Sequence, residues 1–395
     1  MVRKSLRFSA RTRWNLAPNR WARVLEEKRR AGVALLDLTE SNPTRARLPG
    51  PPDILHALAS PAAAAYAPDP RGQLRAREAV SADYERRGCL LHPDQVVLTA
   101  SSSEAYAFLF KLLCDPGDRV LVPRPSYPLF DFLAGLESVE VDSYPLRYDG
   151  EWHLSADAAR AAIRPRTRAI VVVHPNNPTG SFLKAEEAEA VKDLAARNGI
   201  AVVSDEVFAD FAFGLDPRRV PTLASDGPCL AFSLGGLSKA CGLPQLKLGW
   251  IAVSGPAALR ADALARLEVV ADTYLSVGTP VQEALPSILA RRAELHGPIA
   301  ARVRANRDAL ARRLDRGSAV SLLHAEGGWS AVLHLPVHAG EEDWAVRLLE
   351  EADLVVHPGY FFEFDGEGFV VASLLTPPEA LAEGASRILS RVDRA

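Results

Sequence analysis

The stretch Ser233-Leu-Gly-Gly-Leu-Ser-Lys239-Ala-Cys-Gly-Leu-Pro-Gln-Leu-Lys-Leu-Gly-Trp250 places one lysine in a loop of small residues. An apolar run precedes this loop at 230–232, and another follows it at 250–253. A lysine in this setting differs from a solvated surface lysine, because burial disfavours the charged form and leaves a reactive amine. We therefore predict that Lys239 is a chemically active residue that follows a buried strand.

Short apolar runs of the same kind recur along the chain and alternate with helical stretches. They are too short for helices and show no polar alternation, which suits strands that are buried on both faces of a sheet. Such an alternation of strands and helices predicts an α/β fold with a largely parallel sheet. The runs lie at 96–98, 120–122, 169–173, 200–203, 230–232 and 250–253.

The pattern changes after residue 285, where a smaller α+β domain is expected. We predict a large domain over 46–285 and a small domain formed by 1–45 together with 286–395. The elements expected in the small domain are a helix at 18–31, a long charged helix at about 295–315, an apolar strand at 331–335, a helix near 341–352 and a strand near 369–375. In the large domain, a helix at 184–198 is expected to stop at Asn198-Gly199, a typical C-cap.

Composition excludes several classes of protein. The 395 residues are 48% hydrophobic and 24% charged with a net charge of −3, so no basic field for nucleic acid is expected. No apolar run approaches the length of a membrane span, and the basic N-terminal stretch lacks the apolar region of a secretory signal. The four cysteines lack metal-ligand spacing, which predicts reduced thiols, a cytoplasmic protein and no metal site.

Polar residues that could carry chemistry follow several of the apolar runs. Ligands of α/β sheets bind at the carboxyl ends of the strands, where these residues fall. The first run leads into Ser101, Ser102 and Ser103, followed by Glu104. Ser101 and Glu104 fit a capping box, but a helix N-terminus with free N–H groups and hydroxyls also binds phosphate, and both interpretations stay open.

Two further runs end in polar signatures. The run at 169–173 leads into His174-Pro-Asn-Asn177-Pro-Thr-Gly180, and the run at 200–203 leads into Ser204-Asp205-Glu-Val-Phe208. Taken alone, the first marks turns and the second a helix cap. Taken with Ser102 and Lys239, they resemble in order and spacing the class I and II aminotransferases of fold type I. The successive spacings are 75 residues from Ser102 to Asn177, 28 from Asn177 to Asp205 and 34 from Asp205 to Lys239.

The resemblance implies a pyridoxal phosphate (PLP) enzyme with a mostly parallel seven-stranded sheet. It implies that Lys239 holds the cofactor as a Schiff base and moves the substrate proton, and that Asp205 pairs with the pyridine nitrogen. It also implies that Asn177 hydrogen-bonds the ring O3′. The expected reaction is a ping-pong transfer of an amino group between an amino acid and a 2-oxo acid.

Other matches extend the resemblance over nearly the whole chain. Tyr127 resembles the aromatic residue that stacks on the pyridine ring, and Ser238 precedes the lysine at the cofactor. Asn42 and Trp329 resemble substrate-side residues, although Tyr127 and Trp329 could equally be core aromatics. Tyr66 resembles the tyrosine that reaches the PLP phosphate of the neighbouring subunit. Together with the turn at 279–282 it predicts a homodimer.

The chain departs from the family at three positions. Phe208 stands where many relatives have a tyrosine that donates to O3′. Lys247 stands where an arginine usually contacts the phosphate, so the charge is kept but the bidentate geometry is lost. Val371 falls where the last strand usually carries the arginine that binds the substrate carboxylate. Our hypothesis is that Arg45 or Arg47 replaces it, and the alternative is that both are solvated loop residues.

Two other functions are alternatives to transamination. The first is another PLP-dependent reaction on the same fold, such as lyase, deaminase, decarboxylase or oxidase chemistry, because a fold does not fix the reaction. The second is the effector domain of a transcription regulator. We expect the second to be excluded, since 45 residues precede the PLP domain and show no helix-turn-helix pattern.

Overall fold

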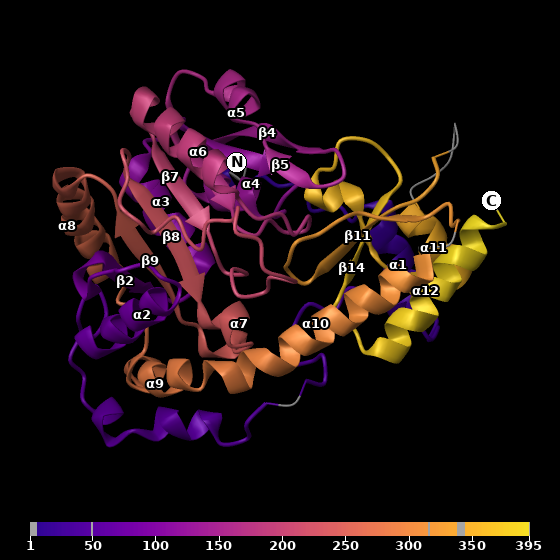
Figure 1. The fold of residues 1–395 in the computed structure, drawn as a ribbon, viewed down its shortest axis with the longest axis horizontal. Helices are drawn as coiled ribbons and strands as arrows, with labels where there is room; N and C mark the ends of the chain where they lie inside the picture. Colours follow the sequence, from indigo (N-terminus) through magenta and orange to yellow (C-terminus); the bar gives the residue numbers. More distant parts are fainter. Residues whose placement is uncertain (1–5, 49, 315–316, 338–343, 395) are drawn as a thin grey trace, which may run out of the picture.

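The apolar runs form strands β2, β3, β6, β7, β8 and β9 of one large sheet in the computed structural model, which describes residues 6–48, 50–314, 317–337 and 344–394 (Figure 1). The sheet has eight strands in the order β2-β9-β8-β7-β6-β3-β4-β5. Their bounds are β2 (Val96–Thr99), β3 (Arg119–Arg124), β4 (Glu140–Tyr148), β5 (Trp152–Leu154), β6 (Thr167–Val173), β7 (Ala201–Asp205), β8 (Ala231–Gly236) and β9 (Gly249–Ser254).

Helices cover both faces of this sheet, as the continuous apolar runs predict. In β6, Val171 and Val173 pack into one core cluster, whereas Ile170 and Val172 pack into another on the opposite face. The first cluster includes α3 (Ser102–Leu113), α4 (Phe130–Leu136) and α8 (Ala257–Tyr274), and the second includes α5 (Ala156–Ala162) and α6 (Ala185–Asn198). Since successive strand residues face opposite sides, a strand buried on both faces must be apolar throughout.

The strand directions are mixed at the margins of the sheet. The pairs from β8 through β7, β6 and β3 to β4 are parallel, whereas β9 is antiparallel to both of its neighbours and β5 is antiparallel to β4. The sheet therefore has one strand more than the seven expected, because β4 turns back into the short hairpin strand β5. The sequence did not indicate β4, of whose residues Tyr144 alone is buried.

A second, antiparallel sheet lies beside the first and has the strand order β10-β11-β14-β13. The N-terminal strand β1 (Leu36–Asp37) pairs in parallel with β12 (Leu354–Val355), which joins the N-terminal region to the C-terminal one. The other strands are β10 (Ser321–Leu322), β11 (Ser330–His334), β13 (His357–Pro358) and β14 (Phe369–Ser373). Around them lie α1 (Arg20–Arg30), α11 (Trp344–Ala352) and α12 (Pro378–Val392).

One long helix, α10 (Arg292–Leu314), runs from α9 under the large sheet to the small one (Figure 1). The domain limits at 45/46 and 285/286 stay a prediction. The remaining helices are α2 (Leu74–Arg86), α7 (Leu237–Ala240), α9 (Thr279–Ala290) and the 3-10 turns η1 (Ala10–Thr12), η2 (Ile54–Ala59), η3 (Pro61–Ala64), η4 (Pro93–Gln95), η5 (Pro244–Leu246) and η6 (Gly359–Phe362).

Helix ends follow local signals. Helix α6 stops where predicted, with Gly199 in the left-handed conformation at φ 62°. Helix α1 is shorter than expected, because Asn19 accepts a hydrogen bond from the Ala22 N–H and caps the helix after Pro18. The first residues of the helix expected at 341–352 lie outside the described part of the chain. None of the described helices is long and apolar enough to cross a membrane, and the cytoplasmic location stays a prediction.

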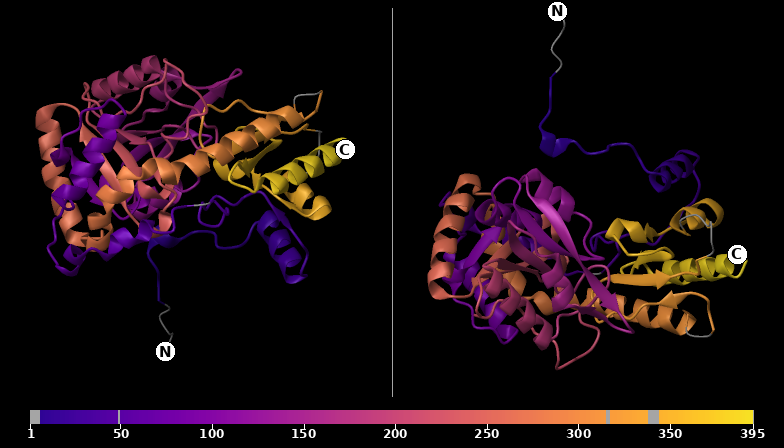
Figure 2. Two further views of the ribbon diagram at one scale, coloured as in Figure 1. Left: turned by 60° about the horizontal axis from the view of Figure 1, so that its bottom comes forward. Right: turned by 90° about the horizontal axis from the view of Figure 1, so that it is seen from above.

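The segment that precedes α1 touches the fold at α4, and its first described residues point outward (Figure 2). Its large apolar side chains are exposed at Leu6, Phe8 and Leu16. Trp14 contacts Phe132 of α4 with ring centroids 5.7 Å apart. This segment therefore contributes little to the core of its own chain.

The central strand β6 provides a test of the fold. Ile170 is fully buried, so Ile170→Ala should lower the free energy of unfolding by about 2–5 kcal/mol and lower the urea midpoint. Leu215→Ala is the control, because that side chain is fully exposed and its removal should change stability by less than about 0.5 kcal/mol. Equal urea midpoints for the two variants would contradict the packing described here.

Candidate functional site

Three neighbouring strands bring the predicted residues to one edge of the large sheet. Strands β6, β7 and β8 are parallel, so their carboxyl ends meet there. Asn177 follows β6, Asp205 ends β7, and Lys239 lies on the short helix α7 directly after β8. All three line one cavity of about 340 Å³. Its other lining residues include Thr39, Ser41, Ser102, Tyr127, Phe208, Trp329, Ser330, His357, Phe361, Phe362, Val371 and Ser373.

The Lys239 amine lies among aromatic rings. Its Nζ is 5.2 Å from the ring centroid of Trp329 and 5.6 Å from that of Phe208. Burial lowers the pKa of Lys239, and the charge of Asp205 opposes this shift. A lysine whose charged form is disfavoured is available as a nucleophile and as a base.

Asp205 is a buried carboxyl group held by two donors. The Tyr106 hydroxyl donates to Oδ2 at 3.2 Å, and the Val207 backbone N–H donates to Oδ1 at 3.2 Å. Burial raises the pKa of Asp205 to about 6, against the effect of these hydrogen bonds. A nearby cation would hold this carboxyl ionised, so the environment suits a partner with a protonated nitrogen.

Asn177 receives a hydrogen bond from the other sheet. The Ser330 hydroxyl, at the start of β11, donates to Asn177 Oδ1 at 3.1 Å. The preceding residue is fixed separately, because Asn176 accepts from the Ser126 hydroxyl at 2.7 Å and donates to the Pro125 carbonyl at 2.9 Å. The amide nitrogen of Asn177 thus remains available to donate.

Ser101 caps α3, one of the two interpretations that the sequence left open, and the phosphate-binding role stays a prediction. Ser101 is the N-cap and accepts a hydrogen bond from the Glu104 N–H at 3.1 Å, while Glu104 accepts one from the Ala100 N–H at 2.6 Å. Ser102 lines the cavity, so the first turn of the helix faces it. Burial raises the pKa of Tyr127, and Ser103 opposes this shift. An anion can bind at such a helix start.

The apolar wall of the cavity contains two of the three departures from the family pattern. Phe208 meets Trp329 edge to face, with centroids 5.3 Å apart. Val371, on β14, is 2% exposed and lies in the wall. Among the described lining residues none is an arginine, and Lys239 is the one lysine. His357 also lines the cavity, and burial lowers its pKa.

The structure leaves several predicted residues outside the cavity wall. Lys247 is exposed in a left-handed turn at φ 50°. Ser238 lies on α7 beside Lys239 but is not among the lining residues. Asn42 accepts from the Thr44 N–H at 3.0 Å within its own turn, and Arg45 and Arg47 are exposed. Their roles stay predictions, while Thr39 and Ser41 of the same loop do line the cavity.

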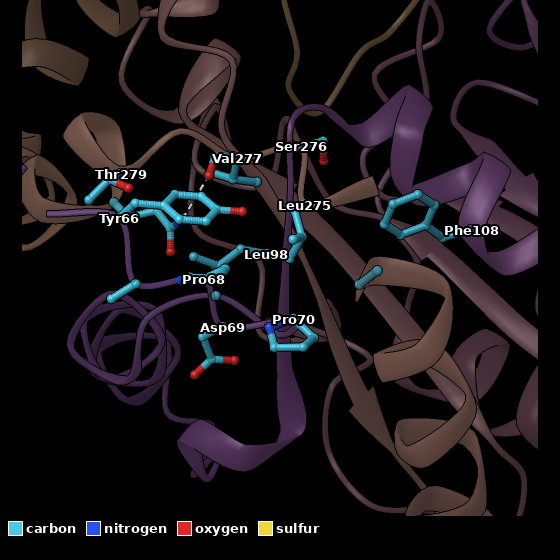
Figure 3. Close-up of a pocket in the computed structure, with 14 residues that line it drawn as sticks. Tyr66, Pro68, Asp69, Pro70, Leu98, Phe108, Leu275, Ser276, Val277 and Thr279 are labelled. Atoms are coloured by element: carbon cyan, nitrogen blue, oxygen red, sulfur yellow. Dashed lines mark hydrogen bonds between the residues drawn. The ribbon is translucent and has the colours of Figure 1, made fainter. Parts of the chain in front are cut away.

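Tyr66 lies at a second, smaller cavity (Figure 3). It is 79% exposed and shares this cavity with Thr279 and Gln282, the two ends of the turn that the sequence grouped with it. Gln282 Nε2 donates to the Val277 carbonyl at 2.8 Å, and Gln282 Oε1 accepts from the Gln73 N–H at 2.7 Å. Tyr66 and the turn at 279–282, which the sequence predicted to serve the neighbouring subunit, therefore line one surface cavity.

Sequence reasoning missed Tyr106 and Ser330, and it assigned no role at the cavity to His357, which it placed in a loop that resembles the family. Tyr106 lies behind Asp205, Ser330 contacts Asn177, and His357 lines the wall. The signals are weak: Tyr106 lies in an apolar helix, and Ser330 follows Trp329 with no motif that links it to Asn177. Both contacts join residues about a hundred or more positions apart, which local pattern does not reveal.

The side chains present fit pyridoxal phosphate. An amine with a lowered pKa, a buried carboxyl, an amide donor and a helix start surround one cavity. These groups match, in turn, the aldehyde, the ring nitrogen, the ring hydroxyl and the phosphate of that cofactor. Tyr127 lies at the same cavity as an aromatic side chain beside them.

Comparison with known proteins agrees with this chemistry. Human tyrosine aminotransferase is 27% identical over 403 residues, covering 96% of this chain and 87% of that protein. The S-alkyl-thiohydroximate lyase of Arabidopsis thaliana is 34% identical over 223 residues, covering 55% of this chain and 48% of that protein. The alanine aminotransferase structure from Pyrococcus furiosus superposes with a TM-score of 0.88 at 25% identity, covering 98% of this chain and 100% of that one.

A family model describes most of the chain. Residues 34–388 match the model for aminotransferase class I and II, a range that includes β1, both sheets and every cavity residue named above. The fold and the match agree along this length. The chain therefore belongs to the class I and II aminotransferases, the fold type I enzymes that transfer amino groups with pyridoxal phosphate.

Proposed function

We propose that this cavity is the active site and that the protein moves an amino group between an amino acid and a 2-oxo acid in two half-reactions. The observation that supports this most directly is that Lys239, Asp205 and Asn177 line one cavity. When bound, pyridoxal phosphate supplies an electron sink for the bond that breaks at the substrate Cα. The chain's own residues bind and orient the reactants and move the proton.

Asp205 and Asn177 tune the site electrostatically. A carboxylate at the ring nitrogen favours the protonated nitrogen, and the hydrogen bonds from Tyr106 and Val207 keep the carboxylate in place. An amide donor at the ring oxygen favours the ionised oxygen. With Phe208 in place of a tyrosine, Asn177 is the amide donor that we assign to this oxygen.

Lys239 is the proton carrier. Its lowered pKa favours the neutral amine, which can take a proton from the substrate Cα and return it elsewhere. The rings of Phe208 and Trp329 flank its Nζ. They limit the water that reaches the amine, which keeps the proton transfer within the site.

The first experiment follows the half-reaction. Addition of an amino acid without acceptor should convert the visible absorbance of the PLP form into that of the amino form, with no ammonia released. Lys239→Ala should slow this conversion by at least roughly 10²–10⁴-fold, since it removes the acid–base group. Lys192→Ala, on α6 outside the cavity, is the control and should retain the rate.

The alternative is lyase or related chemistry on the same cofactor, which the similarity to a plant lyase favours. Release of ammonia or a 2-oxo acid while the cofactor stays in its PLP form would support this alternative. That outcome would contradict the proposed transfer of the amino group. Conversion of the cofactor to its amino form, together with release of one equivalent of 2-oxo acid, would support the proposed transfer of the amino group.

The raised pKa of Asp205 makes the stability of the cofactor-free protein depend on pH. In the cofactor-free protein its folded-state pKa of about 6 lies above the unfolded value, so its ionisation destabilises the fold as pH rises from about 4 to about 6. Cofactor-free Asp205→Asn should therefore exceed the wild type in stability at pH 7.5 by up to about 3 kcal/mol, and by much less at pH 4. Urea unfolding at both pH values measures this difference.

Bound cofactor should reverse the order at pH 7.5, because the wild-type carboxylate then faces a cation whereas the asparagine does not. Asp205→Asn should also bind PLP more weakly. The proposed pairing is wrong if the variant gains the same stability at both pH values and retains wild-type PLP affinity.

We further propose a homodimer in which Tyr66 serves the neighbouring subunit. Tyr66 is exposed, lies at a different cavity from Lys239, and shares that cavity with Thr279 and Gln282. The exposed apolar side chains before α1 also suit burial against a second copy.

Mixed dimers test this arrangement. Tyr66→Ala and Lys239→Ala homodimers should each be impaired. After subunit exchange between them, roughly a quarter of the wild-type activity should return, because hybrid dimers contain one intact site. If Tyr66 acts within its own chain, or the protein is an active monomer by sedimentation, mixing restores nothing and the proposal fails.

A further inference from the structure

We propose that Ser330 is a positioning residue: its hydroxyl fixes the side-chain amide of Asn177 so that the amide nitrogen donates toward the ring oxygen of the cofactor. This inference rests on the proposed role of Asn177. It adds a link between the small sheet, which carries Ser330, and the cofactor-binding edge of the large sheet.

The hydrogen bond itself sets the orientation. Ser330 Oγ lies 3.1 Å from Asn177 Oδ1, and the two residues are 153 positions apart. An asparagine amide has one accepting oxygen and one donating nitrogen. With the oxygen engaged by Ser330, the nitrogen is directed to the other side. An ionised ring oxygen only accepts hydrogen bonds, so it requires the nitrogen and not the oxygen of Asn177.

The loop that leads into Ser330, the first residue of β11, is anchored to the loop that carries Asn177. The Glu326 N–H donates to the Gly180 carbonyl at 3.2 Å, three residues beyond Asn177 in the turn. Gly180 permits this approach, because a Cβ there would lie 2.3 Å from the Gly327 carbonyl oxygen. The two loops are thus joined at the Gly180–Glu326 contact and at the Asn177–Ser330 contact.

Glu326 connects the loop before Ser330 to residues 182–184 and to Arg219. Its buried carboxylate accepts from the Phe182 N–H at 3.0 Å, from Lys184 Nζ at 2.6 Å and from Arg219 Nε at 2.8 Å. Gly328 N–H donates to the Phe211 carbonyl at 3.0 Å. A loop with so many partners presents the Ser330 hydroxyl at a fixed position, which is what a positioning role requires.

Because this chain has Phe208 where many relatives have a tyrosine, the Ser330–Asn177 hydrogen bond matters more for the ring oxygen. Phe208 lies in the cavity wall without a hydroxyl group, so it cannot donate a hydrogen bond there. A single amide that must serve the ring oxygen is effective only if it keeps the correct orientation. The Ser330 hydroxyl supplies that constraint.

The test is the pH titration of the visible absorbance of the bound cofactor. Without Ser330, the Asn177 amide nitrogen is no longer held toward the ring oxygen, and loss of this donor disfavours the deprotonated form of the cofactor. Ser330→Ala should therefore raise the midpoint by about half to one pH unit. The PLP dissociation constant should rise roughly threefold to tenfold. A purely structural role would lower the unfolding temperature but leave the midpoint unchanged.

Threonine and valine form a matched pair at this position, since they differ only in the hydroxyl group. Ser330→Thr should keep the wild-type midpoint, whereas Ser330→Val should shift it as Ser330→Ala does. Both variants carry the same added bulk, so this comparison holds even if one substitution lowers stability. Identical midpoints for the two would overturn the proposal.

Asn177→Ala separates this inference from the role on which it rests. Alone, it should raise the midpoint at least as far as Ser330→Ala does. In the Asn177→Ala background, Ser330→Ala should add nothing, because Ser330 acts through Asn177. An independent, additive shift would overturn the positioning role while it preserves the proposed role of Asn177. No shift from Asn177→Ala would overturn both.

Discussion

The buried carboxyl group of Asp205 is the constraint on which the rest of the site depends. A carboxylate at this depth is costly unless donors and a cation surround it. Two of the donors come from the fold, one from Tyr106 on α3 and one from the backbone of Val207. Burial raises the pKa of this carboxyl group, the charge of Lys239 opposes that shift, and in the proposed function the facing cation is the protonated ring nitrogen of the cofactor. The end of β7 is therefore built for a ligand with a protonated nitrogen, and the neighbouring strands place Asn177 and Lys239 around the same cavity.

The elements that the sequence predicted correctly are those with a local cause. A strand such as β6 must be apolar throughout because both of its faces are buried, and α6 must stop where Gly199 takes the left-handed conformation. The polar signatures after the strands gave the family and the cavity residues Asn177, Asp205 and Lys239 for the same reason. They lie next to the strand ends that position them.

The elements that the sequence missed depend on tertiary contacts. Strand β4 is mostly unburied and forms through its pairing with β3, so its own residues give little signal. Tyr106 reaches Asp205 across 99 positions, and Ser330 reaches Asn177 across 153. The family resemblance grouped Tyr66 with the turn at 279–282, but the cavity that they share depends on how α9 packs.

The charges around the cavity limit how it can select a substrate. Among the described lining residues, Asp205 is the one carboxyl group and Lys239 the one amine, and both serve the cofactor in the proposed mechanism. With Val371 in the wall, a substrate carboxylate meets neutral donors such as Ser41 and Ser373. Neutral hydrogen bonds are weaker than a bidentate contact with a guanidinium. Selection by the described wall therefore depends mainly on apolar contact with rings such as Phe361, and a charged contact with the substrate depends on residues outside the wall, as predicted for Arg45 or Arg47.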